Sequence, residues 1–256
     1  MFRRKPKTML FFCALLAFAA ACGTKNQVNP KLTAEMPPKF LWAWERAEDL
    51  RFLNAKEFGV AFLAQTLTLT GDEVQYRPRR QPLELPEKIY VIAVTRIETV
   101  RESSKSPTYS AEQRRKIVEL IKKTLNSPNV KAIQTDFDVR QSERNFYRSL
   151  TKDLKKDLPA DVPLTITSLA SWCVGDRWFN DFPIDEAVPM AFEMGADDER
   201  IRDFLGKGND WNEPLCRGSY GISVDDPLVG VQFKPNRRVY YFKSSAWEKR
   251  DLERLK

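Results

Sequence analysis

Two aspartates, two residues apart, are the side chains of this sequence whose type and spacing best suit chemistry. They close the run Ala132-Ile133-Gln134-Thr135-Asp136-Phe137-Asp138, which predicts a strand. Side chains alternate between the two faces of a strand, so Asp136 and Asp138 share one face while Ile133 and Phe137 share the other. Two neighbouring carboxylates that lose water raise each other's pKa, which suits them to proton transfer.

A structural role for this pair is the alternative. Asp138 would then cap the helix expected after the strand, and Asp136 would form an ion pair with Arg96 or Arg140. The residues alone leave both roles open, because structural ion pairs perturb carboxyl groups as catalytic sites do.

Histidine is absent from all 256 residues, and this excludes several kinds of site. There is no Ser-His-Asp or Cys-His pair, no histidine metal ligand and no imidazole proton shuttle. Neither GxGxxG nor GxxxxGK[ST] occurs, so we expect no nucleotide, and we predict no cofactor or metal. The formal net charge is +7, but the first eight residues supply four positive charges and leave +3 for the remainder, so no nucleic-acid partner is expected.

Aromatic and polar residues fall near the ends of other expected strands. Indole faces stack on sugar rings and polar groups bind sugar hydroxyls, so together with the aspartates they predict a glycan site. Glu193 joins Asp136 and Asp138 as a candidate catalytic residue. The candidate substrate-binding residues are Trp42, Trp44, Gln65, Arg96, Trp172 and Tyr220.

Eight strand-like runs must position these residues, and helix-like runs separate several of them. Alternating strands and helices predict a parallel sheet, and eight such units predict a single (β/α)₈ barrel of the TIM type over residues 39–256. An open doubly wound sheet is the alternative, although it usually carries a glycine-rich nucleotide turn. The expected strands cover residues 40–44, 59–69, 88–98, 130–138, 163–172, 186–194, 217–224 and 238–242.

The helix-like runs include one with a clear start signal. Ser110 followed by Gln113 predicts a capping box, and further helices are expected from near Ser142, around Ile201 and from about Ser245. Residues 71–87 predict an irregular excursion, and the chain is short for the fold, so some helices are expected to be short or missing.

The amino terminus has the order of a bacterial lipoprotein signal. Basic residues come first, Met9–Ala20 is an apolar run of 12 residues, and small residues precede Cys22. The run is too short to span a bilayer as a helix, which needs about 20 residues. We expect residues 1–21 to be a cleaved signal peptide, Cys22 to be lipidated and residues 22–38 to be a tether. An ordinary secretory signal cut at the same bond is the alternative.

This signal predicts a membrane-anchored protein of the cell envelope that faces the periplasm. It also bears on the cysteines, since Cys13 leaves with the signal and Cys22 carries the lipid. Cys173 and Cys216 then remain to form a disulfide. The objection is that Cys173 follows one expected strand and Cys216 precedes another, which places them at opposite ends of a barrel.

Several segments carry a family resemblance over nearly the whole mature domain. The segments are LWAWERAEDLRFL, EFGVAFLAQTLTLTGDEV, IQTDFDV-x-x-SERNFY, SLASWCVGDRW, DEAVPMAFEMG and PLCRGSYGIS. They resemble the bacterial domain-of-unknown-function family 3142, a resemblance that implies no particular activity.

A more distant resemblance is to family-18 chitinases, which are (β/α)₈ barrels. Asp136-Phe137-Asp138 resembles the end of their DxxDxDxE strand, and Met190-Ala191-Phe192-Glu193 resembles their Met-x-Tyr-Asp. The sequence departs from that motif at Ile133, which replaces its first aspartate, and at Arg140, which stands where the general acid would be. An arginine cannot protonate a leaving oxygen at ordinary pH. Glu143 lies one helical turn further on and is expected to face away.

Two hypotheses follow for the function. The first is an envelope-anchored, glycoside-hydrolase-like barrel that acts on a glycan or cell-wall polymer by carboxylate chemistry. The second is a non-catalytic envelope lipoprotein that binds a glycan or a protein partner through the barrel mouth.

Overall fold

Eight parallel strands form a closed barrel in the computed structural model, which describes Met1 and residues 36–255. The strand order is β1-β11-β10-β9-β8-β7-β6-β3, and β1 also pairs with β3. This last pairing closes the sheet, so the predicted barrel is confirmed and the open sheet is excluded. The strands are β1 (Lys39–Ala43), β3 (Phe58–Thr70), β6 (Tyr90–Thr99), β7 (Val130–Asp136), β8 (Leu164–Leu169), β9 (Glu186–Met190), β10 (Ser219–Ser223) and β11 (Arg238–Phe242).

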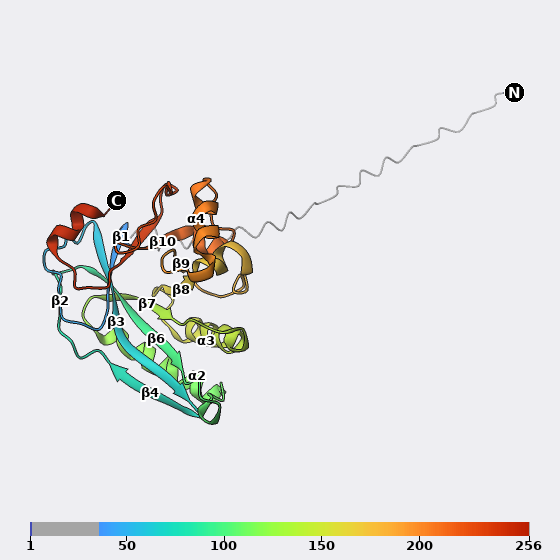
Figure 1. The fold of residues 1–256 in the computed structure, drawn as a ribbon. Helices are drawn as coiled ribbons and strands as arrows, with labels where there is room; N and C mark the ends of the chain where they lie inside the picture. The colour runs from blue at the N-terminus through green and yellow to red at the C-terminus, as the bar shows by residue number, and fades with distance from the viewer. Residues whose placement is uncertain (2–35, 256) are drawn as a thin grey trace.

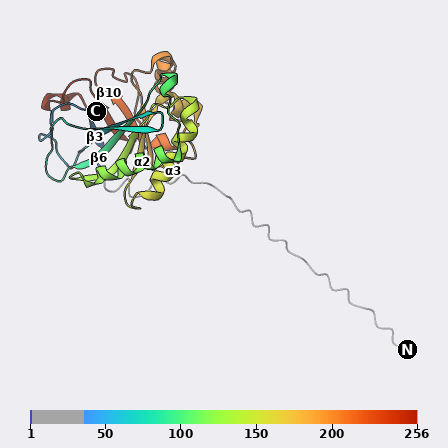
Figure 2. The ribbon, with the colours of Figure 1, turned by 90° about the horizontal axis from the view of Figure 1, so that it is seen from below.

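Three α-helices follow three of the strands and lie outside the barrel (Figure 1). They are α2 (Ala111–Lys123) after β6, α3 (Arg144–Asp157) after β7 and α4 (Asp198–Gly206) after β9. Viewed from below, α2 and α3 run next to each other across one side of the barrel (Figure 2). The predicted capping box is confirmed, because Gln113 N donates to Ser110 Oγ at 3.1 Å and Ser110 N donates to Gln113 Oε1 at 3.3 Å.

The remaining connections contain no α-helix. The excursion expected at residues 71–87 holds β4 (Glu73–Pro78), which extends β3 as an antiparallel strand, and β5 (Leu83–Glu84), which pairs with β2 (Glu48–Asp49). The helix expected from about Ser245 is a 3₁₀ helix over Lys249–Arg254. The other 3₁₀ helices are Ser103–Lys105, Thr124–Asn126, Gln141–Glu143, Gly195–Asp197 and Pro214–Gly218.

The core has an inner part within the barrel and an outer part between the barrel wall and the elements around it. Phe40, Ile92 and Tyr240 belong to the inner cluster. Ile133 and Phe137 pack in the outer cluster, so the alternation predicted for β7 is confirmed. The same alternation turns Asp136 toward the barrel axis.

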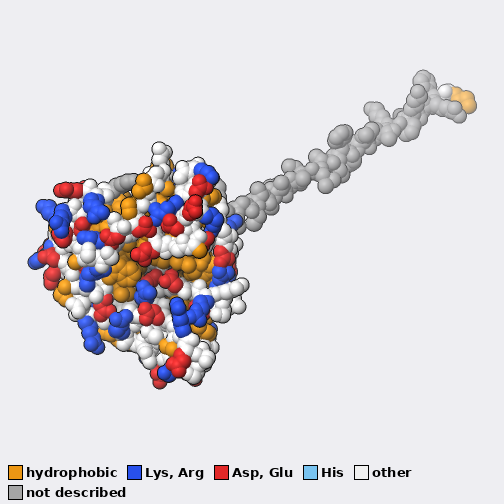
Figure 3. Space-filling view, in the orientation of Figure 1, with side chains coloured by type: hydrophobic (Ala, Val, Ile, Leu, Met, Phe, Trp, Pro, Cys, Tyr) orange, Lys and Arg blue, Asp and Glu red, His pale blue; other side chains and the backbone are white. Residues whose placement is uncertain are grey.

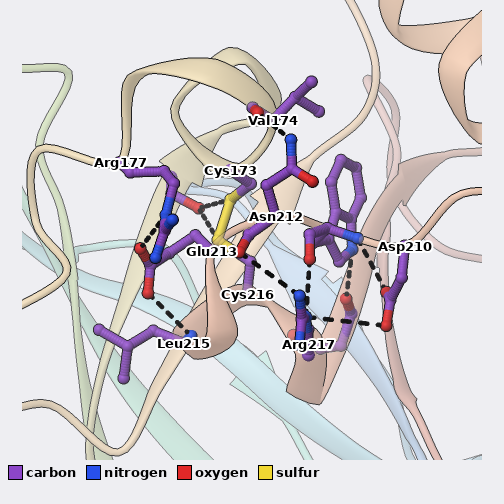
Figure 4. Close-up of a disulfide and its surroundings, with 12 residues drawn as sticks. Cys173, Val174, Arg177, Asp210, Asn212, Glu213, Leu215, Cys216 and Arg217 are labelled. Atoms are coloured by element: carbon purple, nitrogen blue, oxygen red, sulfur yellow. Dashed lines mark hydrogen bonds and ion pairs between the residues drawn. A yellow bond between two sulfur atoms is a disulfide. The ribbon is translucent and has the colours of Figure 1, made fainter.

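The outer layer beside β8, β9 and β10 is built from irregular chain that a disulfide crosslinks (Figure 4). Cys173 and Cys216 are bonded, with their Cα atoms 6.0 Å apart, so the predicted disulfide is confirmed. The expectation that they lie at opposite ends of the barrel was wrong. β8 ends at Leu169, and the chain then enters a π-helical turn over Trp172–Asp176 that returns along the outside of the barrel.

Contacts with the barrel wall locate this disulfide. Ser168 Oγ, on the outer face of β8, lies 3.2 Å from Cys173 Sγ and 4.0 Å from Cys216 Sγ. The Glu213 backbone N–H donates to the Cys173 carbonyl at 2.9 Å, which ties the two segments together beside the sulfurs. Both cysteines are fully buried.

The predicted signal peptide, Cys22 and all of the tether before Met36 lie outside the residues whose structure is described. Within residues 36–255, no helix has the length and apolar character needed to cross a membrane.

Candidate functional site

A cavity of about 440 Å³ opens at the carboxyl ends of the barrel strands. In the space-filling view, hydrophobic atoms are exposed in a hollow near the middle of the visible face, and acidic and basic side chains border it (Figure 3). Chemistry in this fold collects at this end of the barrel. The lining residues are Trp44, Arg96, Asp136, Asp138, Leu169, Ala170, Ser171, Met190, Phe192, Glu193, Met194, Gly195, Asp197 and Ile201.

Asp136 lies at the floor of this mouth cavity, with only 5% of its surface exposed. Its Oδ1 accepts a hydrogen bond of 2.7 Å from Thr167 Oγ1, and its Oδ2 lies 3.6 Å from Arg96 Nη1. The structural alternative of an ion pair with Arg96 is therefore confirmed. Burial, reinforced by the charge of Asp138, nevertheless raises the pKa of Asp136 to about 6.

Asp138 follows β7 and is exposed at the cavity. Among residues 36–255, no group donates a hydrogen bond to its carboxylate. The surrounding protein displaces water and raises its pKa, while Arg96 opposes this shift. The alternative role as a helix cap was wrong, because Arg140 and Glu143 occupy the N-cap positions of the two helical segments that follow.

Arg96 links the two aspartates to the rest of the wall. Its Nε donates to Glu98 Oε1 at 3.0 Å, and its guanidinium lies 5.9 Å from the centre of the Trp44 ring. Arg96 and Trp44 were both predicted from the sequence, and both line the cavity.

Glu193 reaches the same cavity from the loop after β9. Its φ of 49° lies in the left-handed region, which non-glycine residues seldom adopt. Its backbone N–H donates to Asp226 Oδ2 at 2.8 Å, and this bond helps to hold the conformation. Such strain is frequent at functional sites. The three carboxylates proposed from the sequence, Asp136, Asp138 and Glu193, thus line one cavity.

Two other predicted binding residues do not reach the cavity. Trp42 is 1% exposed and packs inside the barrel, with its ring 4.7 Å from that of Phe242. Gln65 is buried and donates to Thr95 Oγ1 at 2.9 Å. A β-bulge between Leu63 and Gln65 shifts the alternation of β3, and Gln65 lines a separate hollow beside α2 instead.

Trp172 and Tyr220 lie in the outer layer and do not line the mouth either. Trp172 comes after the end of β8, where the chain has already turned outward, and packs edge-on against Trp178 with ring centres 5.2 Å apart. Tyr220 is 1% exposed and stacks on Phe233 at 4.5 Å. Of the tryptophans assigned to the rim, only Trp44 contributes to the cavity.

A second hollow of about 320 Å³ adjoins the first and shares Arg96, Asp136 and Asp138 with it. Glu143 lines this side hollow, so the expectation that it faces away was wrong. It is buried, and its Oε1 accepts hydrogen bonds from Tyr109 Oη at 2.8 Å and from Thr99 Oγ1 at 2.9 Å. Its Oε2 accepts from the Arg140 backbone N–H at 2.7 Å.

The sequence reasoning did not identify Tyr109 and Glu143 as neighbours of the site. The spacing of Arg140 and Glu143 gave a local signal, since an acid three residues into a helical segment can accept from the N-cap backbone. Tyr109 gave no such signal, because it reaches Glu143 from a loop 34 residues earlier in the chain.

The Asp136→Asn variant is expected to be more stable than the native protein at neutral pH. The native carboxyl has a pKa of about 6 against an ordinary 3.8, so it holds its proton over a pH range in which the unfolded chain has released it. The stability of the native protein therefore falls as pH rises from about 4 to 6, by on the order of 3 kcal/mol, and is level above that range. Asparagine removes this loss and keeps an oxygen to accept from Thr167.

Urea unfolding of both proteins at several pH values between 4 and 8 checks this expectation. The advantage of the variant should be small at pH 4 and largest above pH 6. Asp161→Asn, at an exposed site in the loop before β8, is the matched control and should follow the native curve. A stability difference between native and Asp136→Asn that does not change with pH would count against a buried, proton-holding Asp136.

Comparisons with family models and with curated proteins give no relative from which to transfer a function. No family model matches the chain, and no curated protein matches it.

Proposed function

We propose that this protein is an envelope-anchored, glycoside-hydrolase-like barrel that acts on a glycan by carboxylate chemistry. The observation that carries the proposal is the Asp136–Asp138 pair in the mouth cavity, with Glu193 entering the same cavity from a different strand. Two carboxyl groups placed around a glycosidic bond are the usual means of hydrolysing it. The barrel fold is compatible with this chemistry.

The three carboxylates take different roles in the proposed reaction. Asp138 is exposed to the cavity and contacts the reacting sugar, while Asp136, buried behind it, tunes its charge. Glu193 donates its proton to the glycosidic oxygen as the bond to the sugar breaks. Water then adds to the sugar, and the proton it releases restores the carboxyl group.

The apolar part of the cavity supports a sugar ligand. Trp44, Leu169, Met190 and Phe192 line it, and Leu169 is one of the few large apolar residues exposed on the described surface. Sugar rings present C–H faces that pack on such side chains, while their hydroxyls face the carboxylates and Arg96.

Non-catalytic binding of a glycan or a protein partner through the mouth is the second candidate. Arg140 favours it, because this residue stands where the resemblance to family-18 chitinases would place the general acid and cannot donate a proton at ordinary pH. The ion pair between Arg96 and Asp136 favours it as well, since it gives one of the two aspartates a structural partner.

An activity screen separates the two candidates. The full-length protein in detergent is incubated with cell-wall and storage glycans, and released reducing ends and bound ligand are both measured. Release of sugar that depends on Glu193 supports hydrolysis, and Glu193→Gln should reduce it by about 100-fold or more. Saturable binding without any release of sugar would support the non-catalytic binding protein instead. If the protein shows no release of sugar and no binding, both candidates are rejected.

We also propose that Cys22 carries the lipid that anchors the protein in the membrane, in keeping with the basic, apolar and small residues that precede it. Cys22→Ser should leave the protein uncleaved or soluble. Cys13→Ser is the matched control, because it changes a cysteine that leaves with the signal. Membrane fractionation and intact mass are the measurements, and an unchanged Cys22→Ser protein would refute the anchor.

We further propose that the chain is related to the domain-of-unknown-function family 3142, on the basis of the segments named above.

A further inference from the structure

The side hollow beside the carboxylates is bordered by two arginines whose guanidinium groups have no bonded partner among the described residues. Arg101 and Arg140 line it and are exposed. Within residues 36–255, neither guanidinium group makes a hydrogen bond or an ion pair.

This is unusual among the arginines of the described chain. Within residues 36–255, every arginine except Arg80, Arg101 and Arg140 donates to a carboxylate or a backbone carbonyl. Two of these three arginines therefore border the same hollow, the one that adjoins the mouth cavity.

The acids around the hollow are already engaged. Glu143 accepts from two hydroxyl groups and one backbone N–H, and Glu98 accepts from Arg96. Asp138 alone has no donor among the described residues, and it faces both hollows. These hydrogen bonds do not cancel the charge of the acids, and the hollow is lined by four acids and three arginines. The guanidinium donors of Arg101 and Arg140 nevertheless have no partner among the described residues, so they are available to a ligand. A guanidinium group offers a planar fork of donors that matches a carboxylate or a phosphate.

We infer that the side hollow is an anion subsite, and that the glycan bound at the mouth carries an acidic substituent, a carboxylate or a phosphate, which Arg101 and Arg140 hold. The inference rests on the proposed function and names its substrate class. Because the two hollows share Arg96, Asp136 and Asp138, a ligand that contacts the carboxylates can place a neighbouring substituent against the arginines. A neutral glycan would leave both arginines without a partner.

Binding of matched sugars to the full-length protein in detergent tests the inference. The probes are an oligogalacturonate, the same oligosaccharide as its neutral methyl ester, and a phosphorylated mannose oligosaccharide with its dephosphorylated form. The native protein should bind one acidic member at least about 10-fold more tightly than its neutral counterpart, and the pair that shows this preference identifies the acidic group.

The variants decide whether the two arginines cause that preference. The double variant Arg101→Gln/Arg140→Gln should lose it while still binding the neutral sugar. Arg80→Gln should keep it, because Arg80 also has no partner in the described part of the chain but borders the hollow beside α2. Equal binding of acidic and neutral sugars by the native protein, or a preference that survives the double variant, would overturn the anion subsite and leave the proposed function standing. No binding of any sugar in the full glycan screen would reject both.

Discussion

Replacing Asp138 with asparagine is expected to reduce glycan turnover by about 1,000-fold without lowering the stability of the barrel. The side chain is exposed at the mouth cavity, and no described residue donates a hydrogen bond to it. Asparagine has nearly the same shape, so the fold loses no hydrogen bond among the described residues. The reaction loses the charge that stabilises the reacting sugar.

Two measurements on the same purified variant distinguish a functional role of Asp138 from a structural one. Turnover or glycan affinity reports the function, and the thermal midpoint reports the fold. Asp161→Asn is the control, because it removes an exposed aspartate from a loop between α3 and β8, away from the cavity. If Asp138→Asn lowers the midpoint by several degrees and ligand affinity is unchanged, Asp138 has a structural role and the site is rejected.

The two aspartates of β7 should therefore respond differently to the same substitution. Asp136 is buried with a pKa of about 6, so its removal is expected to stabilise the protein at neutral pH. The pKa of Asp138 is raised as well, but its side chain is exposed, so its removal should not lower stability and its main effect should be on function. A group that costs stability in its native state is more readily explained by a function than by a structural role.

The barrel itself could be predicted because its signal is repeated. Eight strand-like runs alternate with turns or helices, and each run overlaps one strand of the closed barrel. The inward direction of Asp136 could also be predicted, since it needs only the alternation within β7 and the position of Ile133 in the outer core.

The ends of the strands could be predicted less accurately than their number. For this reason, part of the predicted site was assigned to the wrong place. The run that ends at Trp172 continues as apolar sequence past the end of β8, because the chain turns outward and buries its aromatic residues in the outer layer. Periodicity does not distinguish a buried strand from a buried turn. For Gln65, a single bulge in β3 was enough to reverse the face.

The side hollow could not be predicted either, but for a different reason. Its composition depends on which arginines find partners in the folded chain, and those partners lie far apart in sequence. Arg114 pairs with Asp153, and Arg144 pairs with Asp176, whereas Arg101 and Arg140 have no such partner within residues 36–255. Sequence spacing indicates local ion pairs, but it does not show which cations remain unpaired after folding.

Removing the disulfide should have the largest effect on stability of the changes considered. Cys173 and Cys216 are 43 residues apart, and closing a loop of this length lowers the entropy of the unfolded chain by the equivalent of about 4 kcal/mol. Here the bond also joins the irregular segment that follows β8 to the segment between α4 and β10. The double variant Cys173→Ala/Cys216→Ala should therefore lose about 4 kcal/mol of unfolding free energy, with a fall in thermal midpoint on the order of 10 °C.

Alanine is the appropriate replacement, because both positions are fully buried and a serine hydroxyl would add its own desolvation cost. Reductant provides the internal control. It should lower the midpoint of the native protein to nearly that of the double variant, and it should leave the double variant unaffected. The mouth lies on the other side of the barrel wall from the sulfurs, since Ser168 contacts them from the outer face of β8. At temperatures below its lowered midpoint, the double variant should therefore still bind glycan. If the unfolding curves of the oxidised native protein and of the double variant coincide, the crosslink contributes nothing to stability.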